Sequence, residues 1–81
     1  MNFIPLHNYV VIDKIKENDE LIQNQSQFEK ASVIKVSKEI SILKEGDIVF
    51  IPSFAGDVYI ENDKIYYLVT YNEIIGKFRK E

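Results

Sequence analysis

The sequence has no cysteine and a single histidine among its 81 residues. Without cysteine the chain can build neither a disulfide framework nor a thiolate metal site, which suits a reducing compartment. Its longest apolar runs are far shorter than the roughly 18 residues that a membrane-spanning helix needs, and the N-terminus lacks the basic-then-apolar pattern of a signal peptide. We therefore expect an untargeted, soluble, cytoplasmic protein with no membrane partner.

Positive charge is also scarce. Ten basic and 13 acidic residues give a net charge of -3, the wrong sign for a protein that binds phosphate backbones. Five tyrosines and five phenylalanines would suit a stacking platform for single-stranded nucleic acid. Most of them lie in strand-like runs, where aromatic side chains usually pack in a core or across neighbouring strands. We expect no nucleic-acid partner.

No pattern in the sequence predicts catalysis, a metal or a cofactor. His7 has no partner cluster of histidine or cysteine, so a structural role is the better interpretation. The chain lacks a phosphate-binding glycine loop, a Walker lysine and a recognisable nucleophile–base pair. One acidic group lacks the alternation and glycine of a calcium loop and is interpreted as a solvated face: Asp13, Glu17, Asp19 and Glu20. We expect a protein that is not an enzyme.

Short β-rich segments separated by turns predict an all-β fold. No segment keeps a helical period over about ten residues. Strands are expected at 9–15, 32–36, 48–51, 58–61 and 64–70, with one helical turn at 73–75 before a closing strand at 77–78. Residues 1–81 are the size of one small domain, so we expect a single β-barrel or sandwich.

Two turns have clear local chemistry. Gly46, within Lys44–Asp47, supplies a positive φ before the strand at 48–51, and Asn62-Asp63 forms a two-residue hairpin loop.

A polar insert, residues 17–30, separates the first two expected strands. It is rich in Asn, Gln and Glu and holds one apolar pair, Leu21-Ile22. Such a segment cannot bury enough apolar surface to offset its ordering entropy, so we expect a mobile loop that orders when it docks on a partner. The alternative is that the pair folds back on its own barrel. Phe28 is expected to anchor the base of the loop, or else to be a second docking contact.

Three stretches, in order, resemble the co-chaperonin family of the GroES type (chaperonin-10). Residues 4–8, Ile-Pro-Leu-His-Asn, lead into Val10–Ile12 as the family's Pro-Leu-His leads into a valine-rich strand. Residues 43–49 are similar to its Val-Gly-Asp-x-Val turn and strand. Residues 65–69 followed by 72–76 are similar to its last long strand, short helical turn and final strand.

The resemblance implies a GroES-like β-barrel that forms a homo-oligomeric ring, usually of seven subunits, in which terminal segments pair with neighbours. The ring would cap an ATP-loaded chaperonin of the GroEL type over a non-native client, with ATP bound by the partner. It also implies that the insert is the family's mobile loop and that Leu21, Ile22 and Gln23 bind the chaperonin. The loop is shorter than in common members, lacks their flanking glycines, and has Gln23 at the third, usually apolar position.

Residues 37–45 are too few for the hairpin that roofs the usual dome. This resembles phage-encoded members and implies an open-topped ring, which would act in a host cytoplasm if a virus encodes it. Phe54 and Tyr59 are candidates to face the cage interior. A hypothesis from another class remains open, a monomeric small-barrel module that binds peptide or single-stranded nucleic acid through its aromatic surface. Mass in solution separates the two hypotheses.

Overall fold

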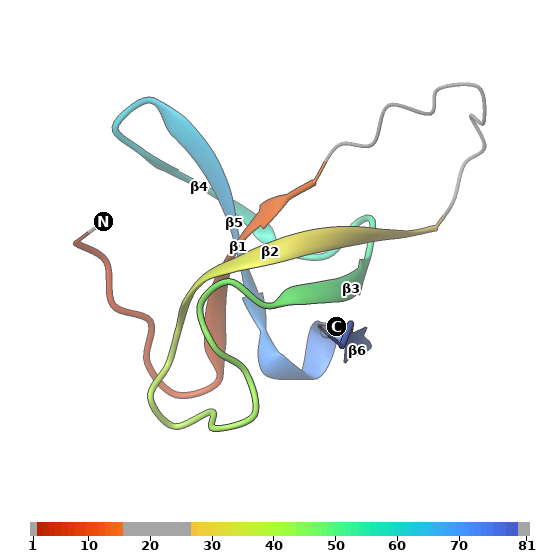
Figure 1. The fold of residues 1–81 in the computed structure, drawn as a ribbon. Coiled ribbons are helices and arrows are strands. Elements are labelled where there is room, and N and C mark those ends of the chain that lie inside the picture. Colours follow the sequence, from red (N-terminus) through yellow and green to blue (C-terminus); the bar gives the residue numbers. More distant parts are fainter. Residues whose placement is uncertain (1, 16–26, 80–81) are drawn as a thin grey trace.

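The computed structural model describes residues 2–15 and 27–79. Six strands and one 3-10 turn make up the regular structure of this part of the chain (Figure 1). They are β1 (Tyr9–Lys14), β2 (Phe28–Val36), β3 (Ile48–Pro52), β4 (Asp57–Glu61), β5 (Lys64–Thr70), η2 (Tyr71–Glu73) and β6 (Gly76–Lys77). The all-β prediction is confirmed.

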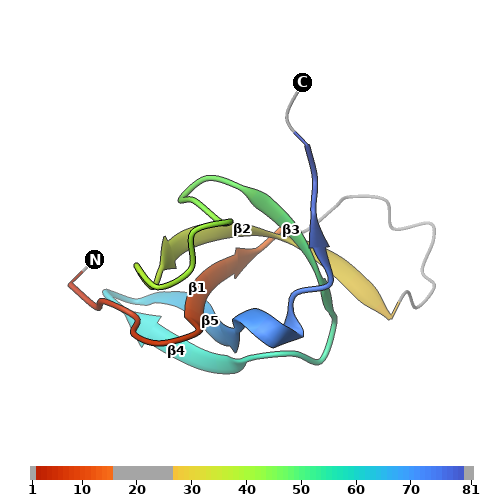
Figure 2. The same ribbon diagram turned by 90° about the horizontal axis from the view of Figure 1, so that it is seen from below.

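All six strands belong to one antiparallel sheet with the order β4-β5-β1-β2-β3-β6. The sheet curls around its core, as the view from below makes clear (Figure 2). Its two end strands, β4 and β6, are not joined to each other by any ladder within the described ranges, so the sheet is open.

The core lies on the inner, concave face of the curled sheet. Alternation along the strands sends Val10 and Ile12 of β1, and Val49 and Ile51 of β3, to this face, where all four are fully buried. The remaining members of the buried cluster come from β2, β5 and two connecting segments: Ala31, Val33, Leu43, Ala55 and Val69. Burial of β-branched side chains on one face therefore fixes the register of the sheet.

The two predicted turns form as expected. Gly46 has φ +95° and donates its N–H to the Val33 carbonyl at 2.8 Å, while Asp47 accepts from the Lys44 N–H at 3.0 Å. Asn62 and Asp63 have φ of 55° and 68°, the left-handed conformation that a two-residue hairpin between β4 and β5 requires.

Most boundaries agree with the sequence prediction to within one residue, and two elements differ by more. β2 begins at Phe28 rather than Ser32, because residues 28–32 pair with β3 from Pro52 back to Ile48. Phe28–Lys30 thus belongs to a strand and not to the polar insert. The helical turn lies at Tyr71–Glu73, earlier than expected, because the Glu73 carboxylate accepts from the Thr70 N–H at 2.9 Å and fixes the start of the turn there.

Candidate functional site

The predicted docking residues Leu21, Ile22 and Gln23 lie outside the described residues, but the base of the insert is described. The end of β1 and the start of β2 are neighbours in the sheet, with Lys14 opposite Ala31 and the Ile15 N–H bonded to the Lys30 carbonyl at 3.0 Å. Both ends of the insert therefore leave the same end of the sheet from adjacent strands.

Lys14 braces this base. Its Nζ donates to the Ser53 carbonyl at 3.0 Å, pairs with Glu29 Oε2 at 3.1 Å, and lies 4.1 Å from the centre of the Tyr67 ring. These partners come from the turn after β3, from β2 and from β5. Because the Lys14 side chain is only 17% exposed, these contacts are screened less than those of a surface ion pair.

Aromatic rings line the outer face at the same end of the sheet. Phe28 stacks on Phe50 with 5.5 Å between centroids, and Phe78 meets Phe50 edge-on at 5.8 Å. The Lys30 ammonium lies 5.0 Å from the Phe78 ring. Phe28 thus sits in β2 at the base of the insert with its ring packed on β3, while 41% of its surface remains exposed.

The two aromatic residues expected to face a cage interior lie in different environments. Phe54, in the turn between β3 and β4, is 85% exposed. Tyr59 is half-buried in β4, with its ring 5.0 Å from Phe3 and 6.4 Å from Tyr66. The structure does not bring Phe54 and Tyr59 into one cluster through any recorded ring contact of the described residues.

The Tyr59 hydroxyl donates a 2.6 Å hydrogen bond to Glu61 Oε1. This bond raises the pKa of Tyr59 above its ordinary value. The same bond, followed by donation from the Asn2 N–H at 3.1 Å, lowers the pKa of the Glu61 carboxyl. Asn2 and Phe3 thereby hold the N-terminal segment on one face of the β4–β5 hairpin.

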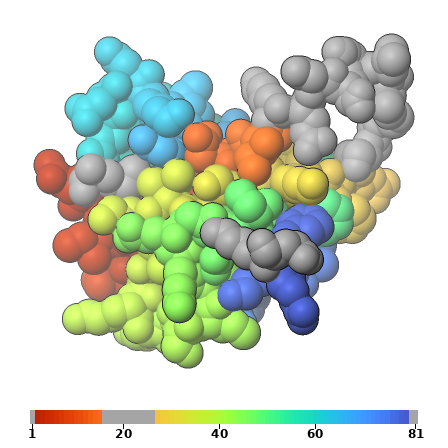
Figure 3. All heavy atoms as spheres, viewed as in Figure 1, coloured from red at the N-terminus to blue at the C-terminus, as the bar shows by residue number. Residues whose placement is uncertain are grey.

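The opposite face of that hairpin carries exposed apolar side chains that the sequence analysis did not single out. Ile60 lies opposite Ile65, and Val58 lies opposite Tyr67; Val58, Ile60 and Ile65 are each more than half exposed. The hairpin stands out from the rest of the molecule (Figures 1 and 3).

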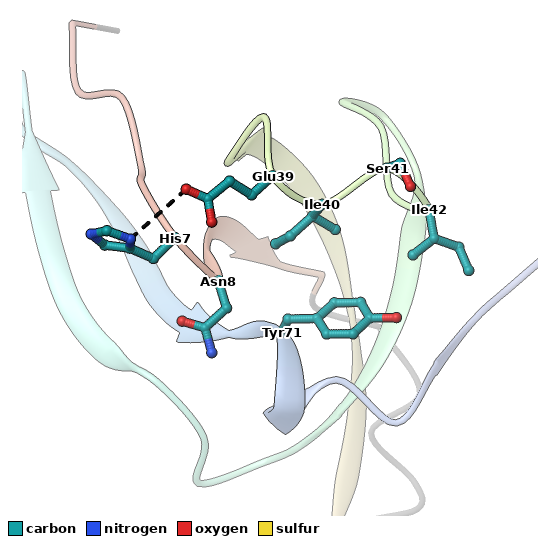
Figure 4. A pocket seen from close by; sticks show the side chains of 7 residues that line it. All are labelled: His7, Asn8, Glu39, Ile40, Ser41, Ile42 and Tyr71. Carbon is teal, nitrogen blue, oxygen red and sulfur yellow. Dashed lines mark ion pairs between the residues drawn. The ribbon is translucent and has the colours of Figure 1, made fainter.

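A surface notch is the second feature that sequence reasoning missed. It has a volume of about 520 Å³ and is lined by three separate segments, namely His7 and Asn8, residues 39–42, and Tyr71 (Figure 4). His7 has φ 60°, a conformation that is uncommon for residues with a side chain, and its Nδ1 lies 3.8 Å from Glu39 Oε2. No local pattern predicts the notch, because the sheet order brings its segments together.

Residues 2–15 and 27–79 contain no group of three or more His, Cys, Asp or Glu side chains that could hold a metal ion. Within the same ranges no helix has the length and apolar character to cross a membrane. No protein-family model matches the chain, and no curated protein matches it.

Proposed function

We propose that this protein is a co-chaperonin, a homo-oligomeric ring that caps an ATP-loaded chaperonin of the GroEL type over a non-native client. The observation that carries the proposal is the braced base of the insert. β1 and β2 are adjacent and Lys14 ties both to the body, so a polar segment containing Leu21-Ile22 leaves one fixed point of the sheet. The three stretches that resemble the co-chaperonin family are the reason for proposing a chaperonin as the partner and a GroES-like barrel as the architecture.

The energetics favour a ring over a single copy. Burying the side chains of Leu21 and Ile22 contributes about 3–6 kcal/mol, whereas ordering even four loop residues costs about 4–8 kcal/mol. One copy alone therefore barely binds. Copies joined in a ring act at high effective concentration, which converts weak contacts into a strong but reversible cap. The subunit number expected from the family is seven.

Exposed apolar side chains at both ends of the chain support self-association. Ile4 and Leu6 near the N-terminus, and Ile75 and Phe78 near the C-terminus, are all exposed. Covering them against a neighbouring copy would remove apolar surface from water in each contact of the ring. In this assembly Phe54, the most exposed aromatic residue recorded, is proposed to face the cage interior; the half-buried Tyr59 offers less surface to a client.

The test is association with a purified double-ring chaperonin, followed as co-migration on a sizing column with and without ATP. Co-migration is expected only with ATP, since the nucleotide belongs to the partner. A Leu21→Ser/Ile22→Ser double variant should lose co-migration while keeping its own oligomeric mass. The matched control is Val58→Ser/Ile60→Ser, which makes the same change on the β4–β5 hairpin and should still co-migrate. Normal capping by the loop variant would contradict the assignment of the loop.

The open edge of the sheet favours one alternative, a monomeric module that binds an extended peptide. β4 is an end strand whose outer edge carries no ladder partner in the described part of the chain, so an added strand could pair with it. Sedimentation velocity separates the two. A monomer that binds peptide and never co-migrates with a chaperonin would favour the module.

A further inference from the structure

The notch formed by His7, Asn8, residues 39–42 and Tyr71 has the chemistry of a receptor for a cation. Among the described residues that line it, Glu39 is the only carboxylate and none is a lysine or arginine. The partner recorded for that carboxylate is His7 Nδ1 at 3.8 Å, which is longer than a hydrogen bond. Both side chains are more than 60% exposed, so the carboxylate keeps the capacity to accept bonds from an incoming group.

The other walls of the notch suit an arginine side chain. Tyr71 presents an aromatic ring, against which a guanidinium group can stack. Ile40 and Ile42 supply apolar surface for the methylene stem of a long basic side chain. Asn8 and Ser41 add an amide and a hydroxyl oxygen as acceptors. Figure 4 shows these side chains around a single opening.

The chain supplies one arginine, Arg79. It is exposed, and it makes no ion pair with any residue of the described ranges. Lys77, two residues earlier in the chain, is already engaged, since its Nζ donates to the Ile42 carbonyl at 2.9 Å and lies 3.4 Å from Asp47 Oδ2. The C-terminal arm, residues 76–79, is thus fixed at its base, because Lys77 lies opposite Val49 in the sheet and the Phe78 N–H bonds to the Ile48 carbonyl at 2.8 Å. Beyond β6 the ribbon continues toward the C-terminus (Figure 2).

We propose that Arg79 of one copy occupies the notch of a neighbouring copy, with its guanidinium on the Glu39 carboxylate and against the Tyr71 ring. The proposal rests on the oligomer invoked for the proposed function and names residues that join its copies. Arm and notch are different surfaces, so the contact is head-to-tail, the type that closes into rings when the rotation between copies allows. Lys77 links the arm to the notch within each copy, because the Ile42 carbonyl that it binds belongs to the wall of the notch.

Charge reversal tests the contact. Glu39→Arg alone and Arg79→Glu alone should each raise the dissociation constant of the oligomer at least about tenfold, because like charges then face each other. An equimolar mixture of the two variants should restore association into alternating open chains and even-numbered rings, since each arm then meets a notch of opposite charge. A closed ring of seven copies would keep one like-charged contact. The readout is the mass distribution in sedimentation velocity over a concentration series, with circular dichroism to verify folding. Glu45→Arg, an acid-to-arginine change at an exposed position outside the notch, is the matched control and should assemble normally.

Three outcomes overturn the proposal. A monomeric wild-type protein at every concentration removes the contact, and unchanged assembly of both single variants removes the role of these residues. Rescue by the Glu39→Arg/Arg79→Glu double variant together with no association of any kind in the mixture, not even as open chains, would show that Arg79 serves its own notch. If Glu39→Arg failed to fold, Glu39→Gln would take its place and should still weaken assembly. Failure of the intact oligomer to bind any chaperonin would instead count against the proposed function alone.

Discussion

Replacing Lys14 with Met tests whether the base of the insert is braced as described. The substitution keeps most of the apolar stem and removes the ammonium group, which bonds the Ser53 carbonyl at 3.0 Å and Glu29 Oε2 at 3.1 Å and lies over the Tyr67 ring. The carbonyl and the carboxylate, which is only 30% exposed, then lose a charged donor. The expected change is therefore a loss of stability rather than a neutral surface effect.

The magnitude follows from these contacts. A hydrogen bond from a charged donor contributes about 1.5–3 kcal/mol, the ion pair at most about 1 kcal/mol because both partners are partly exposed, and the cation–π contact about 0.5–2 kcal/mol. Because such terms do not add, we expect Lys14→Met to lower the free energy of unfolding by about 2–3 kcal/mol. For a domain of this size the loss corresponds to a fall in Tm of roughly 10–20 °C.

The assay is urea denaturation followed by circular dichroism, with the variant expected to lower the midpoint without changing the slope. Lys35→Met is the control, because Lys35 and Glu45 are 3.7 Å apart and more exposed, so its loss should stay within about 0.5 kcal/mol. A double-mutant cycle with Glu29→Gln should give a coupling energy of about 0.5–1.5 kcal/mol. Equal, small losses of stability in Lys14→Met and Lys35→Met would show that the contacts of Lys14 do not stabilise the base of the insert.

Two further predictions concern the β4–β5 region. Gly56→Ala should lower the free energy of unfolding by about 2 kcal/mol or more, because φ is +94° and a Cβ would approach Val69 Cγ1 to 2.8 Å. Gly46→Ala, where φ is similar but no atom lies close to the added Cβ, should cost about half as much. Equal losses of stability in chemical denaturation would contradict the role of the close contact at Gly56. The lowered pKa of Glu61 means that its contribution to stability is present above the unfolded value of 4.5 and is lost as pH falls through the folded pKa. The raised pKa of Tyr59 means that its contribution is present below 10.0 and is lost as pH rises through the folded pKa. The urea midpoint of Glu61→Gln should accordingly depend less on pH at the acidic end than that of the wild type, and parallel profiles would contradict the assignment.

Sequence reasoning predicted the parts of the fold that local chemistry decides. Gly46 and the Asn62-Asp63 pair lie in turns because few residues accept positive φ, and the strands follow runs of β-branched and aromatic residues. The sequence prediction began β2 too late, because Glu29 and Lys30 are polar and were assigned to the insert. In the fold these two residues pair with β3, and that pairing outweighs their low strand propensity. Strand propensity also carries no information on whether a sheet closes.

The candidate site was less predictable, because most of its residues come from segments that lie far apart in the sequence. Leu21-Ile22 stood out because an apolar pair in a polar segment is visible in one stretch of sequence. The notch brings together His7, Glu39 and Tyr71, which lie more than thirty positions apart along the chain, and only the order of the strands makes them neighbours. Lys14 likewise draws its partners from three other elements, so its bracing role appears only in the fold.

The open edge at β4 has a consequence for the behaviour of many copies at high concentration. Exposed end strands invite copies to stack edge to edge and grow into fibrils. If two β4 strands paired antiparallel about Tyr59, Asp57 of each copy would lie opposite Glu61 of the other, and like charges in directly opposed positions are destabilising. Pairing between two copies of β4 is therefore disfavoured, whereas a segment with basic residues could still pair with this edge. The domain can thus keep a free sheet edge without serving as a template for its own aggregation.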